Sequence, residues 1–438
     1  MEKNVFNWKK MDNASMMYSS LQREEYSAIY RYSVMLKKPV DPEALQRAID
    51  KAKPRFPGFF VQIRRGFFWY YFEKNNAPGP FVKKDVAEPC RPLRFNEDNG
   101  WLVRFFYYGC RLSVEIFHAL ADGAGTHVFF KSIIAQYLRE LGISVPYESE
   151  ILNMDDMPSP EEWEDAYTRH LGKVSKSQPL IKHAYQNIGT SEPFYTFNVT
   201  MGFIPVDKLK QRAKERKVSV SEYVGAVLMY VLMKKQKSEK PIKERPIALA
   251  VPVNLRALFP SKTLRNFILV IQPHIDPSLG DYSFDEIAEL THHYLRTHTN
   301  RHEIRARFTR NVKLQNNRAL MLIPRVIKNT IMHISYYKTG VKPFSATMTN
   351  PGVFILPREM KEHISHFEVI QGQNVVPRTT LSMLSYENTM EITFSGTQVE
   401  TDIERELFRF LVRDGVPVKI ESNRDRSKIE YIDFGGEE

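Results

Sequence analysis

The strongest constraint on the fold is a change of hydrophobic period within residues 112–141. Leu112, Val114 and Ile116 alternate with polar residues, as on one face of a β-strand, and His118 keeps this alternation. Beyond Asp122 the apolar residues follow the period of an amphipathic helix, and Gly142 is a typical end for that helix. Its apolar positions are Phe130, Ile133, Ile134, Tyr137, Leu138 and Leu141. The stretch therefore predicts a strand, a tight turn that contains Gly123, and a helix.

The first part of the chain mixes strands and helices in the same way. A strand is predicted up to about residue 36, and Asp41 and Pro42 are typical of the cap and the first position of a helix. Two β-hairpins are predicted, one around Gly66 and one near Gly109.

The second part of the chain is again a mixture of helices and strands. Two helices are predicted within residues 206–236, and Ser219 and Glu222 have the spacing of a capping box for the second. Strands are predicted at 246–256, at 344–356 and, as a hairpin around Glu387 and Asn388, at 380–397. We therefore expect an α/β (α+β) protein.

The length of 438 residues predicts two domains, because single hydrophobic cores stop growing at roughly 250 to 300 residues. Residues 143–190 mix proline, acidic and polar residues with weak periodicity, as inter-domain connections do. We expect an N-terminal domain at 1–170, a linker at 171–190 and a C-terminal domain at 191–438.

The chain is basic, with 62 Lys and Arg against 51 Asp and Glu and a net charge of +11. Such a charge suits an anionic partner, for example nucleic acid, a membrane surface or a cofactor that carries phosphates. The sequence has no finger, homeodomain or RNA-binding sheet motif, so we expect no nucleic-acid partner.

Cysteine content and hydropathy indicate where the protein works. Cys90 and Cys110 are the only cysteines and cannot form a disulfide framework, and the N-terminus has no apolar signal region. A cytoplasmic location is therefore expected. The longest apolar run, Val224–Met233, is about half the ~20 residues of a membrane-spanning helix, so we expect no transmembrane segment.

His118 is the candidate catalytic residue on position and chemistry. A strand that delivers a histidine into a tight turn fixes the imidazole on both sides, and a histidine can accept a proton from an alcohol or amine near neutral pH. Asp122 could orient the ring, or it could turn away and fix the turn through an arginine. Alternatively, His118 only ends a strand and Asp122 only caps the next helix.

Four short motifs occur in order along the chain. Their residues are Arg55, Phe56 and Pro57; His118, Asp122 and Gly123; Arg256 and Asn266; and Thr349, Asn350 and Gly352. Together they resemble the H-x-x-x-D-G acyltransferase superfamily of chloramphenicol acetyltransferase, peptide-synthetase condensation domains, wax ester synthases and alcohol acetyltransferases. The T-N-x-G stretch is similar to the S-N-x-G signature of the alcohol acetyltransferase branch, with Thr349 in place of serine.

The resemblance implies two chloramphenicol-acetyltransferase-like domains, each a mixed β-sheet flanked by helices, with an active-site tunnel at their interface. It also implies transfer of an acyl group, in the simplest case acetyl, from a coenzyme A thioester to a small-molecule alcohol. Acyl-CoA would be a co-substrate, with no permanently bound cofactor and no metal. The alternatives are a condensation-type enzyme that takes its acyl group from a carrier protein, and a catalytically silent relative. Phe117 stands where condensation domains usually have a first histidine, which disfavours amide formation.

The same resemblance assigns roles to residues. His118 would be the general base within the catalytic motif that Asp122 and Gly123 complete. Arg256 would be the structural partner of Asp122. Thr349 and Asn350 are candidates to stabilise the oxyanion, although an Asn-Pro-Gly stretch is also typical of a simple turn. The sequence has no G-x-S-x-G element, so the expected mechanism forms no acyl-enzyme.

Two further clusters have simpler explanations. Four histidines crowd into one predicted basic helix, of which two could share a metal on one helix face, but no third ligand is identifiable. They are His292, His293, His298 and His302. Residues 206–217 predict a basic helix with an apolar stripe at Val206, Leu209 and Ala213, and its cations could alternatively contact coenzyme A phosphates.

Overall fold

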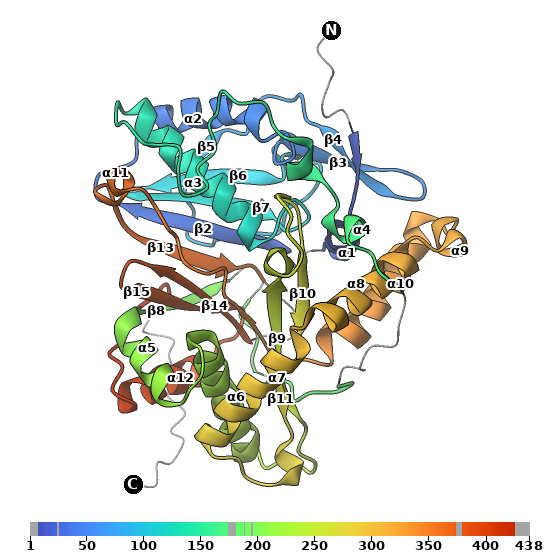
Figure 1. Cartoon of the computed structure of the whole chain (residues 1–438), viewed down its shortest axis with the longest axis vertical. Helices are drawn as coiled ribbons and strands as arrows, with labels where there is room; N and C mark the ends of the chain where they lie inside the picture. The colour runs from blue at the N-terminus through green and yellow to red at the C-terminus, as the bar shows by residue number, and fades with distance from the viewer. Residues whose placement is uncertain are drawn as a thin grey trace.

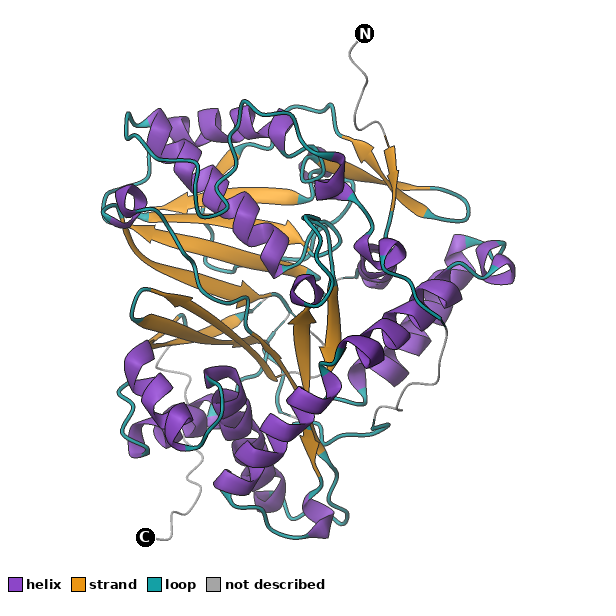
Figure 2. Cartoon of the chain, viewed as in Figure 1, coloured by secondary structure: helices purple, strands orange, loops and turns teal. Residues whose placement is uncertain are grey.

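The computed structural model describes residues 8–23, 26–173, 181–187, 189–193, 196–373 and 379–424. Within these residues the chain forms two large β-sheets and one small one, with helices on their outer faces (Figure 1, Figure 2). The mixed α/β class expected from the sequence is confirmed.

The first large sheet has the strand order β13-β2-β7-β6-β5. In that order its strands are Ile364–Gln371, Ile29–Leu36, Arg111–Phe117, Val103–Tyr108 and Val82–Lys84. The predicted hairpin near Gly109 is β6 and β7, which pair antiparallel. Helices α2 (Pro42–Arg55) and α3 (Gly123–Glu140) cover the upper face of this sheet (Figure 1).

The second large sheet follows the order β10-β9-β12-β14-β15-β8-β16, and β11 pairs with β9 beside this path. Its strands are Ile268–Ile271, Ile247–Asn254, Ala346–Thr349, Thr379–Tyr386, Thr389–Gly396, Asn198–Pro205 and Lys419–Ser422, with β11 at His274–Ile275. The outer side carries α5 (Val206–Glu215), α6 (Val220–Ser238), α7 (Phe284–His298) and α12 (Asp402–Arg413) (Figure 1). Parallel pairing of β12 with both β9 and β14 makes this sheet mixed.

The remaining elements lie at the edges. The small sheet has the order β1-β4-β3, from Trp8–Lys10, Tyr70–Lys74 and Val61–Arg65, and contains the predicted hairpin around Gly66. The other helices are α1 (Asn13–Leu21), α4 (Ala166–Arg169), α8 (Arg301–Gln315), α9 (Arg318–Met321), α10 (Arg325–Tyr336) and α11 (Arg358–Lys361). Helices α8 and α10 project together from the body, with α9 at the tip (Figure 1).

Helix starts follow the cap residues that the sequence predicts. The Asp41 side chain accepts hydrogen bonds from the backbone N–H of Glu43 and Ala44 at the start of α2. Ser219 and Glu222 form a complete capping box at the start of α6. Each cap satisfies backbone donors that the helix leaves unpaired, which is worth roughly 1 kcal/mol.

One strand departs from the expected division into domains. The sheets fall on either side of the predicted linker at 171–190, of which residues 174–180 and 188 lie outside the described part. However, β13 comes from the second half and pairs antiparallel with β2 of the first half. The Val369 backbone N–H, on β13, also donates to the carboxylate of Glu391 on β15. The predicted C-terminal domain, residues 191–438, therefore contributes a strand to the first sheet, because the edge of β2 pairs with a strand that is distant in sequence.

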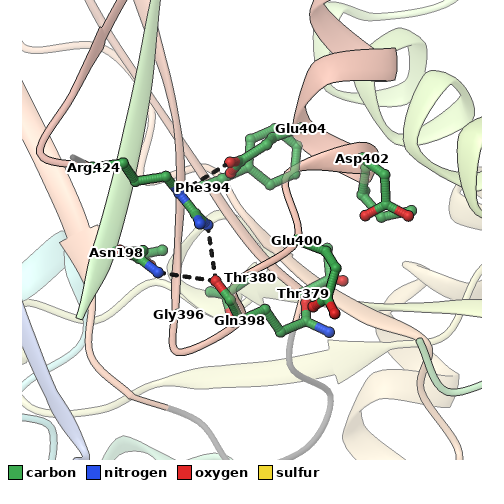
Figure 3. A pocket seen from close by; sticks show the side chains of 12 residues that line it. Asn198, Thr379, Thr380, Phe394, Gly396, Gln398, Glu400, Asp402, Glu404 and Arg424 are labelled. Carbon is green, nitrogen blue, oxygen red and sulfur yellow. Dashed lines mark hydrogen bonds and ion pairs between the residues drawn. The ribbon is translucent and has the colours of Figure 1, made fainter. Parts of the chain in front are cut away.

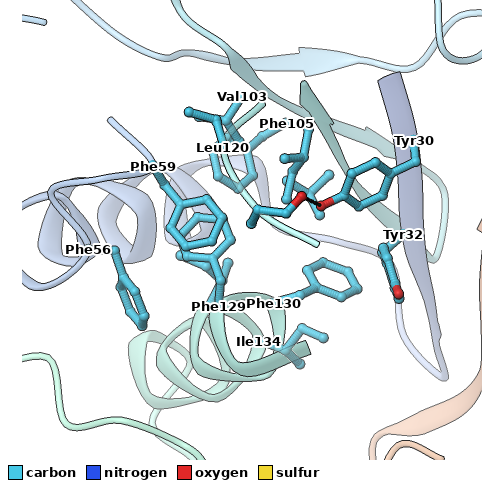
Figure 4. Packing of buried hydrophobic residues seen from close by; sticks show 14 of the residues in the cluster. Tyr30, Tyr32, Phe56, Phe59, Val103, Phe105, Leu120, Phe129, Phe130 and Ile134 are labelled. Carbon is cyan, nitrogen blue, oxygen red and sulfur yellow. Dashed lines mark hydrogen bonds between the residues drawn. The ribbon is translucent and has the colours of Figure 1, made fainter. Parts of the chain in front are cut away.

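Aromatic packing fixes α3 on the first sheet. Phe59 and Phe129 stack with their ring centroids 4.0 Å apart, and Phe56 meets Phe129 edge-on (Figure 4). Phe105 and Phe130 are also fully buried in this cluster. Burial of such a side chain stabilises the fold by about 1.5–3 kcal/mol, so the N-terminal end of α3, which follows His118, has a rigid support.

Candidate active site

His118 lies in the turn between β7 and α3. Its backbone N–H donates to the carbonyl of Ala28 at 2.7 Å, and the Leu120 N–H donates to the carbonyl of Phe117 to close the turn. The hydroxyl of Tyr30, on the neighbouring strand β2, donates to the carbonyl of Ala121 at 3.0 Å. The position of His118 is therefore determined by backbone hydrogen bonds on both sides of the residue.

The His118 ring is oriented by Asn266. Asn266 Nδ2 donates to the His118 backbone carbonyl at 2.8 Å, which turns its Oδ1 towards His118 Nδ1 at 3.2 Å. An Nδ1–H that donates to this oxygen leaves Nε2 as the basic nitrogen. The ring stacks on Tyr18 with centroids 4.3 Å apart and meets Tyr30 edge-on. Burial among these rings lowers the pKa of His118, so the imidazole is neutral at neutral pH.

The Asp122 carboxylate points away from His118. Its Oδ1 caps α3 by accepting from the Gly125 N–H, and its Oδ2 accepts from Arg256 Nη1 at 2.8 Å and from the Phe267 N–H at 2.7 Å. Asp122 is almost completely buried. Asp122 therefore pairs with Arg256, which is one of the two expected arrangements. It does not hold the His118 ring, which was the other.

The partners of His118 and Asp122 come from one connection between β9 and β10. Asn266 and Phe267 lie near its end, and Arg256 lies near its start. The guanidinium of Arg256 also donates to the carbonyls of Thr263 and Arg265, which closes the connection on itself. The connection from the second sheet thus docks on the turn of the first sheet that contains His118.

A second ion pair fastens the same connection to the N-terminal helix. Arg265 pairs with Asp12, the cap residue of α1, at 2.8 Å, and both side chains are buried. The Leu264 N–H donates to the carbonyl of Glu162, whose carboxylate holds Arg55 with two hydrogen bonds. Arg55 belongs to the R-F-P element that the sequence singles out, so this motif supports the docked connection.

His118 lines a cavity of about 770 Å³ that both halves of the chain enclose. Tyr18, Tyr30 and Tyr32 line it from the first half, and Ala250 and Thr349 from the second. The lining also includes the cations Lys182, Arg307, Arg310 and Lys338. A space of this size can hold a small-molecule substrate next to the histidine.

The two oxyanion candidates differ in what their side chains do. Thr349 ends β12 and lines the cavity. Asn350 also lines it, but its side chain donates to Ser221 Oγ at 2.9 Å and accepts from the Gly352 N–H. These bonds hold the turn, so the Asn350 amide is committed to local structure, whereas Thr349 remains a lining residue of the cavity.

Gly123 and Gly125, at the start of α3, have different surroundings. Gly123 lines the cavity, and a Cβ there would lie 3.2 Å from the Tyr32 hydroxyl. At Gly125 a Cβ would lie 1.9 Å from the carbonyl oxygen of Leu264, in the docked connection. Of these two glycines, Gly125 is therefore the one at which a Cβ would meet the backbone of the docked connection.

The histidine cluster does not form the single helix that the sequence predicts. Helix α7 ends at His298 and α8 begins at Arg301, so His298 and His302 do not share a helix. The Nδ1 atom of His298 bonds to Glu303, and that of His292 bonds to Glu222. Among the described residues no group of three or more His, Cys, Asp or Glu could hold a metal ion. The Asn300 cap explains the break, because it starts a new helix.

The basic helix 206–217 lies away from the cavity. Val206, Leu209 and Ala213 are its buried stripe, as expected. None of its residues lines the cavity. In Figure 1, α5 lies at the left of the helices that cover the second sheet, whereas α8 and α10 lie at the right. Contact of this helix with coenzyme A phosphates therefore has no support here.

Comparison with solved structures identifies the fold. Polyketide synthase associated protein 5 from Mycobacterium tuberculosis is 14% identical, with 93% of this chain and 97% of that chain covered and a TM-score of 0.58. The trichothecene 15-O-acetyltransferase TRI3 from Fusarium sporotrichioides is 10% identical, with coverage of 94% and 98% and a TM-score of 0.58. A mutant starter condensation domain of rhizomide synthetase RzmA, in complex with C8-CoA, is 12% identical, with coverage of 94% and 95% and a TM-score of 0.57.

The chain has the fold of these three proteins, one of which is an acetyltransferase and one a condensation domain by name. No family model matches the sequence, and no curated protein matches it either. The fold expected from the four motifs is thus confirmed at the level of architecture.

Within this acyltransferase fold, sequence reasoning missed two side chains that contact or face the histidine turn. The sequence places Asn266 in a motif with Arg256, and nothing in its local pattern indicates that it bonds to His118. Tyr32 is buried on β2, lines the cavity beside Gly123, and its hydroxyl has no hydrogen-bond partner among the described residues. Burial raises the pKa of Tyr32, so the hydroxyl remains protonated.

A second pocket is small and polar. It holds about 30 Å³ and lies between β14, β15 and α12, where Arg424 bonds to Glu404 and to the Gln398 carbonyl (Figure 3). Burial raises the pKa of Glu404 to about 7. This volume suits a water molecule rather than a substrate, so the cavity at His118 is the candidate active site of the acyltransferase fold.

Proposed function

We propose that the protein is an acyltransferase that moves an acyl group, in the simplest case acetyl, from a coenzyme A thioester to an alcohol. The observation that carries the proposal is the neutral His118, whose Nδ1 faces Asn266 Oδ1, at the edge of a cavity enclosed by both halves of the chain. A base oriented in this way can act on an acceptor held in the cavity.

The proposed reaction is a direct transfer. Nε2 of His118 removes the proton of the acceptor hydroxyl as its oxygen attacks the thioester carbonyl. The tetrahedral intermediate then expels the coenzyme A thiolate, which receives the proton from the imidazolium. The products are an ester and free coenzyme A, and no acyl group becomes attached to the protein.

Two hydroxyl groups are candidates to stabilise the oxyanion of that intermediate. Thr349 is the one expected from the sequence, and its place beside the cavity supports this role. Tyr32 is added by the geometry, because its protonated, buried hydroxyl has no partner among the described residues and lies next to Gly123, which lines the cavity. Removal of one such donor typically costs on the order of a hundredfold in turnover.

Supporting observations come from the neighbours in fold. TRI3 is an O-acetyltransferase by name, and the RzmA domain was solved with C8-CoA. The fit of the chain to both is consistent with an acyl-CoA co-substrate and with no permanently bound cofactor. The RzmA likeness equally favours the second candidate, a condensation-type enzyme with a carrier-protein donor.

The test is a thiol-release assay with acetyl-CoA and a panel of alcohols. We expect acceptor-dependent release of free thiol that is lost in His118→Ala and kept in His293→Ala, a matched change of an exposed histidine on α7. Absence of turnover with acyl-CoA, together with turnover from a loaded carrier protein, would favour the condensation-type enzyme. Absence of turnover with both donors would favour a catalytically silent relative.

A further inference from the structure

Helix α10 presents its apolar side to solvent. Six apolar residues of the α9–α10 segment are exposed, with Leu322 at 73% and Val326 at 69%, and they fall on about half of the helix circumference. We call this set the α10 face: Leu322, Val326, Ile327, Ile331, Ile334 and Tyr337. Surface helices normally turn their apolar side to the core, so this orientation indicates a surface that meets an apolar partner.

The inner side of α10 is held by polar contacts. Arg325 donates from its guanidinium to the carbonyl of Gly66 and to the Tyr70 hydroxyl, and Asn329 donates to the same hydroxyl. Lys328 donates to the carbonyl of Phe68 at 3.1 Å. These contacts fix the rotation of the helix, so the apolar residues cannot turn inwards without breaking them.

The hairpin tip under α10 adds exposed aromatic side chains. Phe67 is 72% exposed, and its backbone carbonyl accepts from the Arg325 N–H, which places it beside the start of α10. Phe68 is also exposed and packs edge-on against Phe67. Aromatic and aliphatic residues at one surface are typical of elements that lie in a membrane interface.

The surroundings of the α10 face are strongly basic. No Asp or Glu occurs from Ile304 to Pro357, and this interval contains nine Lys and Arg. They are Arg305, Arg307, Arg310, Lys313, Arg318, Arg325, Lys328, Lys338 and Lys342. Arg325 and Lys328 lie on the inner side of α10, and Arg307, Arg310 and Lys338 line the cavity. Lys313 and Arg318 are exposed on the arm itself. Such a field attracts an anionic surface, whereas a second copy would bring the same cations against these.

The shape also favours a membrane over a protein partner. The α8–α10 arm projects from the body with α9 at its tip (Figure 1, Figure 2), and the side chains of the α10 face are exposed on this arm. Helix-binding protein surfaces are grooves that receive an apolar stripe. A projecting apolar ridge with flanking cations instead fits the boundary between acyl chains and anionic headgroups.

The active-site cavity reaches this arm. Leu314 of α8, Tyr336 of α10, and Lys338 and Thr339 after it line the cavity that contains His118. The arm that carries the α10 face therefore forms part of the wall of the cavity that contains His118.

We propose that the α10 face docks the protein on an anionic membrane surface and that the acceptor is a membrane-resident amphiphilic alcohol. The docking part stands independently of the chemistry, whereas the acceptor class rests on the proposed acyl transfer. The two parts are therefore tested by separate readouts.

Docking is tested by co-sedimentation of the full chain with vesicles. We expect binding to phosphatidylcholine vesicles that contain phosphatidylglycerol, weaker binding to pure phosphatidylcholine, and loss of binding at high salt. The triple variant Val326→Gln, Ile327→Gln and Ile331→Gln should bind at least about tenfold more weakly, because each change removes apolar contact with the bilayer. The pair Lys313→Ser and Arg318→Ser should weaken binding about fivefold per cation.

The matched control replaces exposed apolar residues elsewhere, with Ile242→Gln, Leu279→Gln and Val412→Gln. This control should bind vesicles like the unchanged chain, and unchanged thermal unfolding would show that both triple variants fold. Equal vesicle binding by the α10 variant and the control would overturn the proposal. A dimer in solution that the α10 variant dissociates would also overturn it. So would a chain that binds no vesicles but binds a carrier protein, if the α10 variant loses that carrier-protein binding.

The acceptor class is tested by turnover with a long-chain alcohol embedded in vesicles and with a short soluble alcohol. The α10 variant should lose rate only with the embedded acceptor. Equal loss with both acceptors would refute the proposed route from the membrane. Vesicle binding without turnover of any acceptor would instead leave docking intact and reject the acyltransferase.

Discussion

At the residue scale, the side chain that orients the His118 ring is a neutral amide and not the Asp122 carboxylate. Asn266 is a neutral partner for Nδ1, and the nearest carboxylate in the motif, Asp122, is occupied by Arg256. Burial lowers the pKa of His118 by more than the Asn266 hydrogen bond and the Asp122 charge raise it. The His118 ring is therefore positioned by a hydrogen bond and kept neutral by burial.

Replacement of His118 by alanine should lower kcat by about a hundredfold or more, the usual effect of a lost general base, while the fold is retained.

For the unchanged protein, kcat/KM should be flat near neutral pH and fall on acidification, because only the neutral imidazole accepts a proton. Since burial lowers the pKa of His118, the midpoint of this fall should lie below the ordinary histidine value of 6.5. A pH profile with a midpoint at or above that value would contradict the assigned environment.

Replacement of Asp122 by alanine should destabilise the protein as well as lower activity. The change leaves the Arg256 guanidinium without its carboxylate and removes the cap of α3, and loss of one partner of a buried pair costs about 3 to 5 kcal/mol. Denaturant unfolding measures this loss. A matched control is Asp285→Ala, which removes an exposed partner of Arg216 and should cost less than about 1 kcal/mol.

At the element scale, the site depends on how the start of α3 meets the connection between β9 and β10. A Cβ on Gly125 would lie 1.9 Å from the Leu264 carbonyl oxygen, so the two halves of the chain approach closely there. Burial of the Glu404 carboxyl, which lies on α12 and far from His118, has a separate effect on the free energy of unfolding.

The variant Gly125→Ala should lower the stability markedly, because its Cβ would lie 1.9 Å from the Leu264 carbonyl oxygen and backbone must move to relieve the clash. Gly123→Ala is the comparison, since its Cβ would meet side-chain atoms at 3.2 Å and more. Thermal unfolding should rank Gly125→Ala well below Gly123→Ala. Equal melting temperatures would mean that this contact is not tight in solution.

The variant Glu404→Gln should stabilise the protein above pH 7 and not near pH 4. Burial raises the pKa of Glu404 to about 7, above the unfolded value of about 4.3, so ionisation opposes folding increasingly as pH rises between these values. Below the unfolded pKa the carboxyl is neutral in both states and the penalty disappears. Chemical denaturation at several pH values measures the difference, and a pH-independent difference would contradict the raised pKa.

At the scale of the whole molecule, the cavity exists only because the two halves meet. Strand β13 joins the sheets by pairing with β2 and by contacting β15, and the β9–β10 connection brings Asn266 and Arg256 to the histidine turn. No described helix has both the length and the apolar character that crossing a membrane requires. A site enclosed in this way can hold donor and acceptor together.

Simultaneous binding predicts sequential kinetics and no acyl group on the protein. Intact mass after incubation with acyl-CoA alone should equal the mass of the untreated chain. Burial raises the pKa of Cys90, which disfavours a thiolate nucleophile there, and Cys110 does not line the cavity. A stoichiometric adduct that the acceptor removes would refute direct transfer even if acyl transfer itself is correct.

Local patterns in the sequence were sufficient to predict elements and the candidate base. The period change at 112–141, the caps at Asp41 and Ser219, and the two N-terminal hairpins each depend on neighbours within a few residues, and all are found in the structure. The position of His118 at the end of β7 followed from the same local rule. Four short motifs in order added the correct architecture.

Tertiary structure alone decided which distant residues complete the site. Asn266 is 148 residues from His118, and β13 pairs with a strand that lies more than half the chain away, so no local period encodes either contact. The outward turn of α10 is also invisible in the sequence, because an amphipathic pattern predicts a face but not which side meets the core. That side was set by the hydrogen bonds of Arg325 and Asn329 to the β3–β4 hairpin.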